Sequence, residues 1–132
     1  MSLFKNIFNS NTSTNKKPQL NWIPLNEINV LSELKAASNK KPILIFKHST
    51  RCGISSMALK NFERSFDIAE EELTIYFLDL LRFREISNTI VAEFNVQHQS
   101  PQAIVIYKEK VIYHDSHYGI SVEEIKNVLK TK

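Results

Sequence analysis

The chain has 132 residues, of which 42% are hydrophobic and 23% charged, and its formal net charge is +3. These values are typical of a soluble globular domain with one core. No apolar run approaches the roughly 20 residues that a membrane-spanning helix needs. Residues 1–10 also lack the long apolar segment of a secretory signal. We therefore expect neither a membrane anchor nor a signal peptide.

The positive charge is concentrated in the first 17 residues, which carry Lys5, Lys16 and Lys17 and no acid. Removing these three from the 17 basic residues leaves 14, which equal the 14 acidic residues. The remaining basic residues are scattered and are not rimmed by aromatic side chains, so the pattern does not indicate nucleic-acid binding. Residues 1–19 are polar and aperiodic. They predict a disordered tail before a single domain over 20–132.

Hydrophobic periodicity predicts an alternation of strands and helices. Pro24 keeps a first short strand at the edge of a sheet. Asn26 is the expected N-cap of the first helix, Met57 is expected on the apolar face of the second, and Ser121 with Glu124 has capping-box spacing before the last. The expected elements are a strand over 20–25, a helix over 26–41, a central strand over 40–49, a helix over 52–69, a strand over 71–81, a helix over 83–96, a hairpin over 101–115 and a helix over 121–130.

This order, β-α-β-α-β-α-β-β-α, implies parallel strands in the first half and an antiparallel hairpin in the second. It predicts a thioredoxin-like three-layer α/β/α fold, in which a mixed central sheet ends in a C-terminal β-hairpin and a closing helix. Periodicity alone leaves other α/β folds open, so the motifs must decide.

Cys52 is the only cysteine, which excludes an internal disulfide and favours a reducing, cytoplasmic location. It lies where the central strand passes into the next helix. The free N–H groups at a helix start favour the thiolate form, and Arg51 adds a favourable charge. The opposing interpretation is that Cys52 is a small buried apolar residue. Its placement at the junction favours a reactive thiol.

Residue 55 is the place of the second cysteine in a dithiol oxidoreductase, but here it is Ser55. The motif is therefore Cys-x-x-Ser, with Gly53 as the first variable residue, expected to reduce the steric cover over Cys52. A mixed disulfide at Cys52 then has to be resolved by a thiol from outside the chain. Ser55 could equally contact the backbone near the start of the helix.

Ser100-Pro101 opens the hairpin. The plain interpretation is a trans turn or an edge position, because only about 5–6% of X-Pro bonds are cis. In a thioredoxin-like fold the same place holds a cis-proline beside the active thiol, with the preceding backbone free to pair with substrate. We therefore expect a cis bond at Pro101.

His114 and His117 flank Asp115, but nothing in the sequence completes a metal-ligand set, so no metal site is predicted. His48 ends the central strand four residues before Cys52. It is expected to be a partly exposed bystander. Gly119 is expected in a turn before the last helix.

Three blocks carry a specific resemblance: "ILIFKHSTRCGIS" around Cys52, "SPQ" at 100–102 and "SH" at 116–117. In this order they resemble the monothiol bacilliredoxins of the thioredoxin superfamily, and the resemblance spans about residues 20–130. Members of that family often have proline where this chain has Gly53. The glycine makes the motif similar to that of the monothiol glutaredoxins as well.

The resemblance to the bacilliredoxins implies a cytosolic enzyme that removes bacillithiol from proteins during oxidative stress. Cys52 would be the catalytic nucleophile, with bacillithiol as thiol co-substrate and no bound cofactor. Bacillithiolated client proteins, a low-molecular-weight thiol and a partner bacilliredoxin or reductase are the implied partners; nucleic acid and membranes are not. The expected substrate contacts are Arg51, Gly53, Ser55, Ser100, Pro101, Ser116 and His117.

Two alternatives remain open. A monothiol glutaredoxin would bind a [2Fe–2S] cluster with glutathione, yet that family has paired glycines before the last helix, where this chain has only Gly119. A non-catalytic thioredoxin-fold adaptor would keep its function in a Cys52→Ser variant. An orange-brown colour after anaerobic purification would support the glutaredoxin. Function that survives in the Cys52→Ser variant would support the adaptor.

Overall fold

Strand β2 (Ile43–His48) lies at the centre of a five-stranded mixed sheet in the computed structural model, which describes residues 20–132. The strand order is β1-β3-β2-β4-β5. β1 and β2 run parallel to β3, whereas β4 is antiparallel to both β2 and β5. The other strands are β1 (Ile23–Pro24), β3 (Thr74–Asp79), β4 (Gln102–Tyr107) and β5 (Lys110–Ser116).

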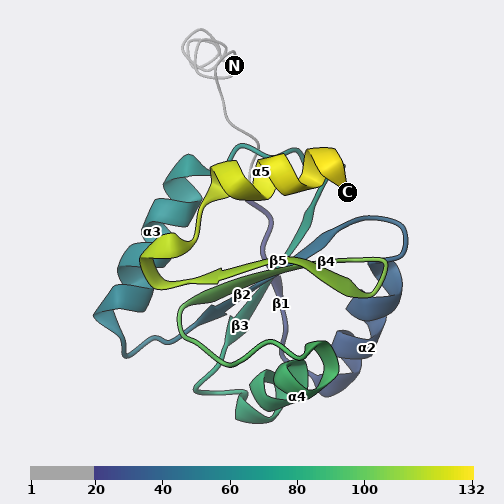
Figure 1. The fold of residues 1–132 in the computed structure, drawn as a ribbon. Helices are drawn as coiled ribbons and strands as arrows, with labels where there is room; N and C mark the ends of the chain where they lie inside the picture. The colour runs from purple at the N-terminus through teal and green to yellow at the C-terminus, as the bar shows by residue number, and fades with distance from the viewer. Residues whose placement is uncertain (1–19) are drawn as a thin grey trace, which may run out of the picture.

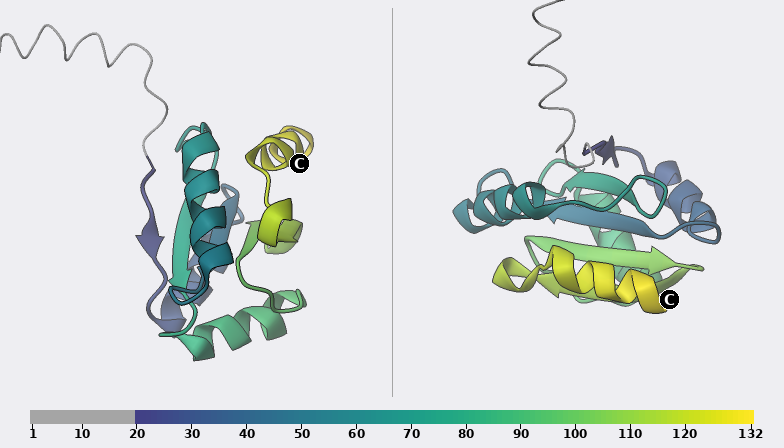
Figure 2. Two further views of the ribbon diagram at one scale, coloured as in Figure 1. Left: turned by 90° about the vertical axis from the view of Figure 1, so that its left-hand side faces the viewer. Right: turned by 90° about the horizontal axis from the view of Figure 1, so that it is seen from above.

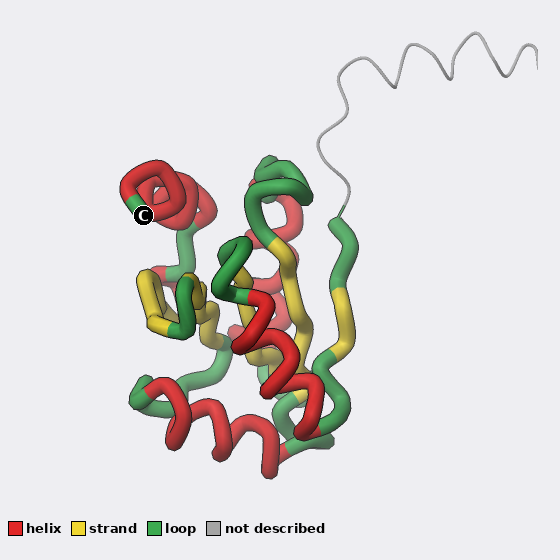
Figure 3. The backbone as a smooth tube through the Cα atoms, turned by 90° about the vertical axis from the view of Figure 1, so that its right-hand side faces the viewer, coloured by secondary structure: helices red, strands yellow, loops and turns green. Residues whose placement is uncertain are grey.

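Four α-helices cover the two faces of this sheet among the described residues (Figure 1). The helices α2 (Ile28–Ala37) and α4 (Arg84–Phe94) pack on one face, and α3 (Gly53–Ser65) and α5 (Val122–Thr131) pack on the other. Figure 3 shows helices above and below the strands in a side view, with β1 at the right-hand margin. A 3-10 turn, η1 (His117–Gly119), connects β5 to α5.

The sheet separates two hydrophobic cores because successive side chains of a strand point to opposite faces. Ile43 and Ile45 of β2 belong to the core under α2 and α4. Leu44 and Phe46 belong to the core under α3 and α5. All six residues of β2 are buried, as expected for a strand covered on both sides.

The sheet topology brings three chain segments to one end of the sheet. His48 at the end of β2 is paired with Asp79 at the end of β3, since these strands are parallel. Gln102 at the start of the antiparallel β4 is paired with Lys47. The loops that follow β2 and β3 and the loop that precedes β4 therefore meet at this end.

The structure confirms the predicted fold, and Pro24 does lie in an edge strand. Ser121 caps α5 as predicted, because its Oγ accepts a hydrogen bond from Glu124 N at 3.1 Å. Asn26 is not the N-cap of α2. Glu27 occupies that position and makes no side-chain cap hydrogen bond.

The helix predicted over 52–69 ends at Ser65, because Phe66 adopts an extended backbone and turns its ring into the core. Met57, predicted on the apolar face, is 51% exposed. Periodicity could not resolve this position, because the helix buries a narrow stripe formed by Ser55, Ala58 and Phe62 instead.

The tail predicted over 1–19 lies outside the described residues. Between Leu20 and Lys132, no helix is both long enough and apolar enough to cross a membrane. Figure 2 shows, in its left view, α4 and α5 at opposite ends of the molecule with the strands between them.

Candidate active site

Cys52 is the N-cap residue of α3 and has an extended backbone, with φ −113° and ψ 121°. Its N–H donates to Ser49 O at 3.2 Å and its carbonyl accepts from Ser56 N at 3.1 Å, so its backbone closes the turn that starts the helix. The thiol is free and partly exposed. It therefore lies where the unpaired N–H groups of a helix favour a negative charge.

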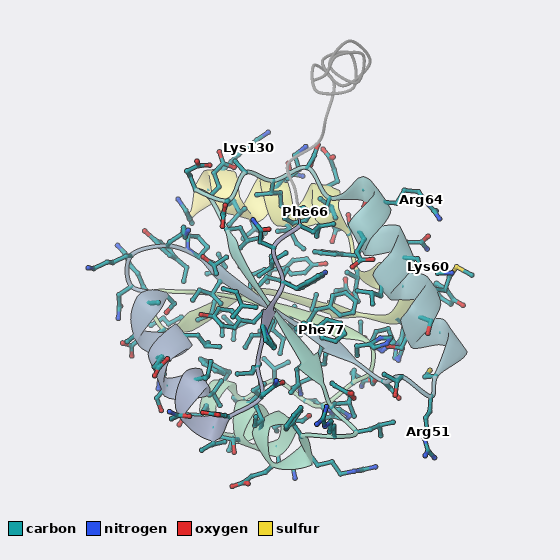
Figure 4. All side chains as sticks on the ribbon, turned by 180° about the vertical axis from the view of Figure 1, so that it is seen from behind. Arg51, Lys60, Arg64, Phe66, Phe77 and Lys130 are labelled. Carbon is teal, nitrogen blue, oxygen red and sulfur yellow. The ribbon has the colours of Figure 1, made fainter. Side chains whose placement is uncertain are left out.

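The two neighbours of Cys52 leave it accessible. Arg51 is exposed and points outward at the end of α3 (Figure 4). Gly53 is also exposed, and a Cβ atom added to it would meet nothing within 4 Å. Both observations describe an open approach to the thiol, and the roles of Arg51 and Gly53 as substrate contacts stay predictions.

Ser55 points into the protein rather than toward solvent. The residue is fully buried, and its Oγ accepts a hydrogen bond from Ser49 N at 3.0 Å. The same oxygen lies 2.8 Å from Nδ1 of His48. Ser55 thus connects the start of α3 to the end of β2 and fixes the turn that carries Cys52. The structure gives its hydroxyl two internal partners, and direct substrate contact stays a prediction.

His48 is 7% exposed and is therefore not the partly exposed bystander that the sequence suggested. Burial lowers its pKa, while Asp79, its register partner on β3, and Glu63 act in the opposite direction. The ring also packs against Phe77, with centroids 5.5 Å apart. His48 is therefore held neutral near pH 7 beneath the Cys52 turn.

The structure brings together four of the predicted contacts. The Ser100-Pro101 bond is cis, as expected. His117 N donates to Pro101 O at 3.0 Å, and Ser116 is the register partner of Gln102. Since η1 also packs against α3, the segments 100–101 and 116–117 lie beside the helix that begins at Cys52.

Three large apolar side chains are exposed on α3 and on η1. Ile54 and Met57 project from the first turns of α3 with exposures of 43% and 51%, and Tyr118 projects from η1 with 74%. They come from two elements that pack against each other, and α3 is the helix that Cys52 caps. The sequence did not predict these three exposed side chains, and it placed Met57 on the apolar face of its helix.

Lys47 and His48 are candidate functional residues that the sequence analysis did not select, although the sequence contained a signal for them. Both are buried at the end of a strand whose other residues are apolar. A charged and an ionisable residue inside a continuous apolar strand rarely occur without a role in pairing or chemistry. The sequence "ILIFKH" contained that signal.

A separate cavity of about 380 Å³ lies at the other end of the molecule, where Lys130 is labelled in Figure 4. Its lining includes Pro42, Ile68, Tyr107, Leu129 and Lys130. None of the predicted site residues contributes to it. Within residues 20–132, no group of three or more His, Cys, Asp or Glu side chains could hold a metal ion.

The central strand, the thiol at the start of the following helix and the adjoining proline loop define a redox protein of thioredoxin fold with one cysteine. Solved structures support this class. One, a candidate oxidoreductase described with a thioredoxin fold, matches with TM-score 0.68 and 26% identity over 80% of this chain and 91% of its own.

Two further similar structures are thioredoxins. The thioredoxin Mala s 13 of Malassezia sympodialis has TM-score 0.67 and 13% identity, covering 89% of this chain and 95% of its own. The reduced thioredoxin pre-protein of Schistosoma mansoni has TM-score 0.58 and 16% identity, with coverages of 85% and 98%. At these identities they show the fold alone.

The family model of the monothiol bacilliredoxin BrxC matches residues 23–125, which include every predicted site residue. The chain belongs to this family.

Proposed function

We propose that this protein is a monothiol thiol–disulfide oxidoreductase that removes bacillithiol from protein mixed disulfides in the cytoplasm. The observation that carries the proposal is the free, partly exposed thiol of Cys52 at the N-terminus of α3, in a chain with no second cysteine. Membership of the monothiol bacilliredoxin family supports bacillithiol as the group removed.

In the first step the Cys52 thiolate attacks the bacillithiol sulfur of the mixed disulfide. A new disulfide forms between Cys52 and bacillithiol, the old disulfide breaks, and the client cysteine leaves as a thiolate that takes a proton from water. In the second step an external bacillithiol, or the thiol of a partner bacilliredoxin, attacks the adduct. Cys52 then leaves as a thiolate, and the disulfide has moved to the attacking thiol.

Two groups of side chains support this substrate assignment. Bacillithiol carries carboxylates. Arg51, the chain neighbour of Cys52, offers an exposed cation, and Ser116–His117 offers hydrogen-bonding groups on the segment that contacts Pro101. Ile54, Met57 and Tyr118 offer apolar contact area to a protein client. A small-molecule disulfide alone would not need that area.

The test measures transfer by intact mass. A protein carrying one bacillithiol adduct is mixed with wild type or Cys52→Ala, and a glutathione adduct of the same protein is run in parallel. We expect the wild type to gain the mass of bacillithiol as the client loses it, and the alanine variant to gain nothing.

Other results would replace the proposal. Faster transfer of glutathione, with an orange-brown protein after anaerobic purification, would favour a glutaredoxin that binds a [2Fe–2S] cluster. If neither adduct reaches Cys52, the protein is better explained as a non-catalytic adaptor.

A further inference from the structure

Lys47 is a buried cation beneath the loop that leads to the active-site proline. Its exposed fraction is 0%, and its register partners, Leu78 on β3 and Gln102 on β4, are both uncharged. Its Nζ lies 3.4 Å from Nδ1 of His98. A buried ammonium group normally needs a carboxylate or several hydrogen bonds, so this arrangement has a cost in stability.

His98 lies over Lys47 in the loop between α4 and β4. The residue is exposed on its outer side, while its Nδ1 is shared between Lys47 and Ser87, whose Oγ also lies 3.4 Å away. Lys47 can only donate, because an ammonium group has no acceptor. Nδ1 of His98 must therefore be the unprotonated acceptor, and the ring is neutral with its proton on Nε2.

A third contact holds the same loop. Gln102 Nε2 donates to Gln97 O at 2.9 Å. The loop is thus fastened by side chains from three elements: Lys47 from β2, Ser87 from α4 and Gln102 from β4. It ends at Ser100-Pro101, the segment that lies beside the helix of Cys52 and accepts the hydrogen bond of His117.

We propose that Lys47 and His98 are positioning residues that form a protonation-sensitive latch, which holds the loop 95–100 in place and so sets the position of Ser100 for substrate binding at Cys52. Protonation of Nδ1 converts the acceptor into a donor that faces an ammonium group. The contact from Lys47 is then lost, because two donors face each other. Ser87 can keep its contact, since its hydroxyl accepts as well as donates, and the loop is released from β2.

The charges around His98 favour the closed latch at neutral pH. Burial and the positive charge of Lys47 both lower the pKa of His98. Ser87 of α4 and Gln102 of β4 face the loop as neutral groups. Lys47 is thus the charge that opposes protonation, and the latch opens at a lower pH than the pKa of an unperturbed histidine would give.

The first test uses NMR and does not depend on any activity. We follow the titration of the His98 ring and the amide shifts of Ser100 and Gln102 in wild type, in Lys47→Met and in His98→Asn. Asparagine keeps an acceptor near the Nδ1 position and has no titrating group. Lys60→Met and His114→Asn, at exposed positions on α3 and β5, are the matched controls.

We expect the Ser100 and Gln102 amides of wild type to shift with the protonation of His98, and those of His98→Asn to stay unchanged across the same pH range. Lys47→Met should raise the pKa of His98, whereas Lys60→Met should not. If the two amides ignore the titration of His98, or if Lys47→Met leaves that titration unchanged, the latch does not exist.

The second test rests on the proposed function, because it measures transfer from the bacillithiolated client. As the pH falls through the titration of His98, KM for the client should rise by about fivefold in wild type relative to His98→Asn, the change expected from one ordinary hydrogen bond. Alkylation of Cys52 by iodoacetamide needs no loop contact, so its rate at each pH should match in the two proteins.

The two tests separate the two proposals. Loss of transfer in all proteins with the NMR coupling intact would overturn the proposed function and leave the latch standing. An equal KM in wild type and His98→Asn at every pH would show that the latch does not position Ser100 for substrate. A difference in alkylation that accounts for the whole difference in transfer would assign His98 to thiol activation and overturn the positioning role.

Discussion

Strand β2 has two parts that are buried alike but are built from different residues: an apolar half, Ile43–Phe46, and a shorter polar half, Lys47–His48. Ile43 to Phe46 are apolar and fill both hydrophobic cores, whereas Lys47 and His48 bring a cation and an imidazole into the same buried layer. The polar half lies next to Cys52 and to the loops that surround it. The apolar half supplies stability. The polar half has a cost in stability, which the proposed latch would offset by positioning the site.

The largest expected effect comes from the apolar half. Phe46 is fully buried and packs against Trp22 and Phe62, with ring centroids 5.9 and 5.4 Å away. Phe46→Ala should lower the free energy of unfolding by about 3–5 kcal/mol, since it removes contacts and leaves a cavity. Urea unfolding measures this, with Tyr118→Ala as an exposed aromatic control. A loss below about 1 kcal/mol would contradict this view of the core.

Lys47→Met should raise the free energy of unfolding, whereas Phe46→Ala lowers it. Burial lowers the pKa of Lys47 from 10.5 to about 8, so between these pH values the unfolded chain holds a proton that the folded chain has released. The unfavourable contribution of Lys47 is complete below pH 8 and is removed as the pH rises to 10.5. It corresponds to about 3 kcal/mol.

Urea unfolding at several pH values should therefore find Lys47→Met more stable than wild type at pH 7. The difference between the two proteins should shrink between pH 8 and 10.5. Lys60→Met, which removes an exposed ammonium on α3, should show neither effect. If Lys47→Met is less stable than wild type at pH 7, the buried ammonium has a stabilising partner, and the two halves of β2 do not differ in the way argued above.

The sequence predicted the apolar half better than the polar half. Alternating apolar segments were enough for the element order and for the central strand, because burial on both faces leaves a continuous apolar run. The position of Cys52 at the start of a helix and the cis bond at Pro101 could be predicted from their places in that order. The segments 100–101 and 116–117 were brought together by the pairing of β4 with β5, which follows from the predicted hairpin.

The polar half required three-dimensional contacts. Ser55 was identified from its spacing to Cys52, but its bonds to His48 and Ser49 depend on how α3 packs on β2. The contact between Lys47 and His98 joins residues 51 positions apart on different elements. No local pattern predicts such a contact. The exposure of Met57 likewise depends on which stripe of α3 faces the sheet.

Removing the Ser55 hydroxyl tests the connection between α3 and the polar half. Ser55→Ala leaves the N–H of Ser49 and Nδ1 of His48 without this partner in a buried setting. The free energy of unfolding should fall by about 1–3 kcal/mol. The neighbouring exposed serine provides the control, and Ser56→Ala should change stability by less than about 0.5 kcal/mol. Equal effects in the two variants would mean that the buried bonds contribute nothing.

Gly53→Pro should have the smallest effect, and it should be stabilising. Gly53 is the first residue of α3, a position that proline favours because its fixed φ suits a helix start and its missing N–H has no intrahelical acceptor there. The residue before a proline must be extended, and Cys52 already is, with φ −113° and ψ 121°. An added side chain also meets open space.

The proline restricts the unfolded chain, so thermal or urea unfolding should give a gain of about 0.4–1 kcal/mol over wild type. Gly53→Ala separates the loss of glycine flexibility from the fixed φ of proline, because alanine removes that flexibility without fixing φ. A gain in the alanine variant combined with a loss in the proline variant would show that the Cys52 backbone leaves the extended region in solution. The conclusion that the apolar half of β2 supplies stability would then still hold. The turn that presents the thiol would be less firmly held than the contacts of Ser55 imply.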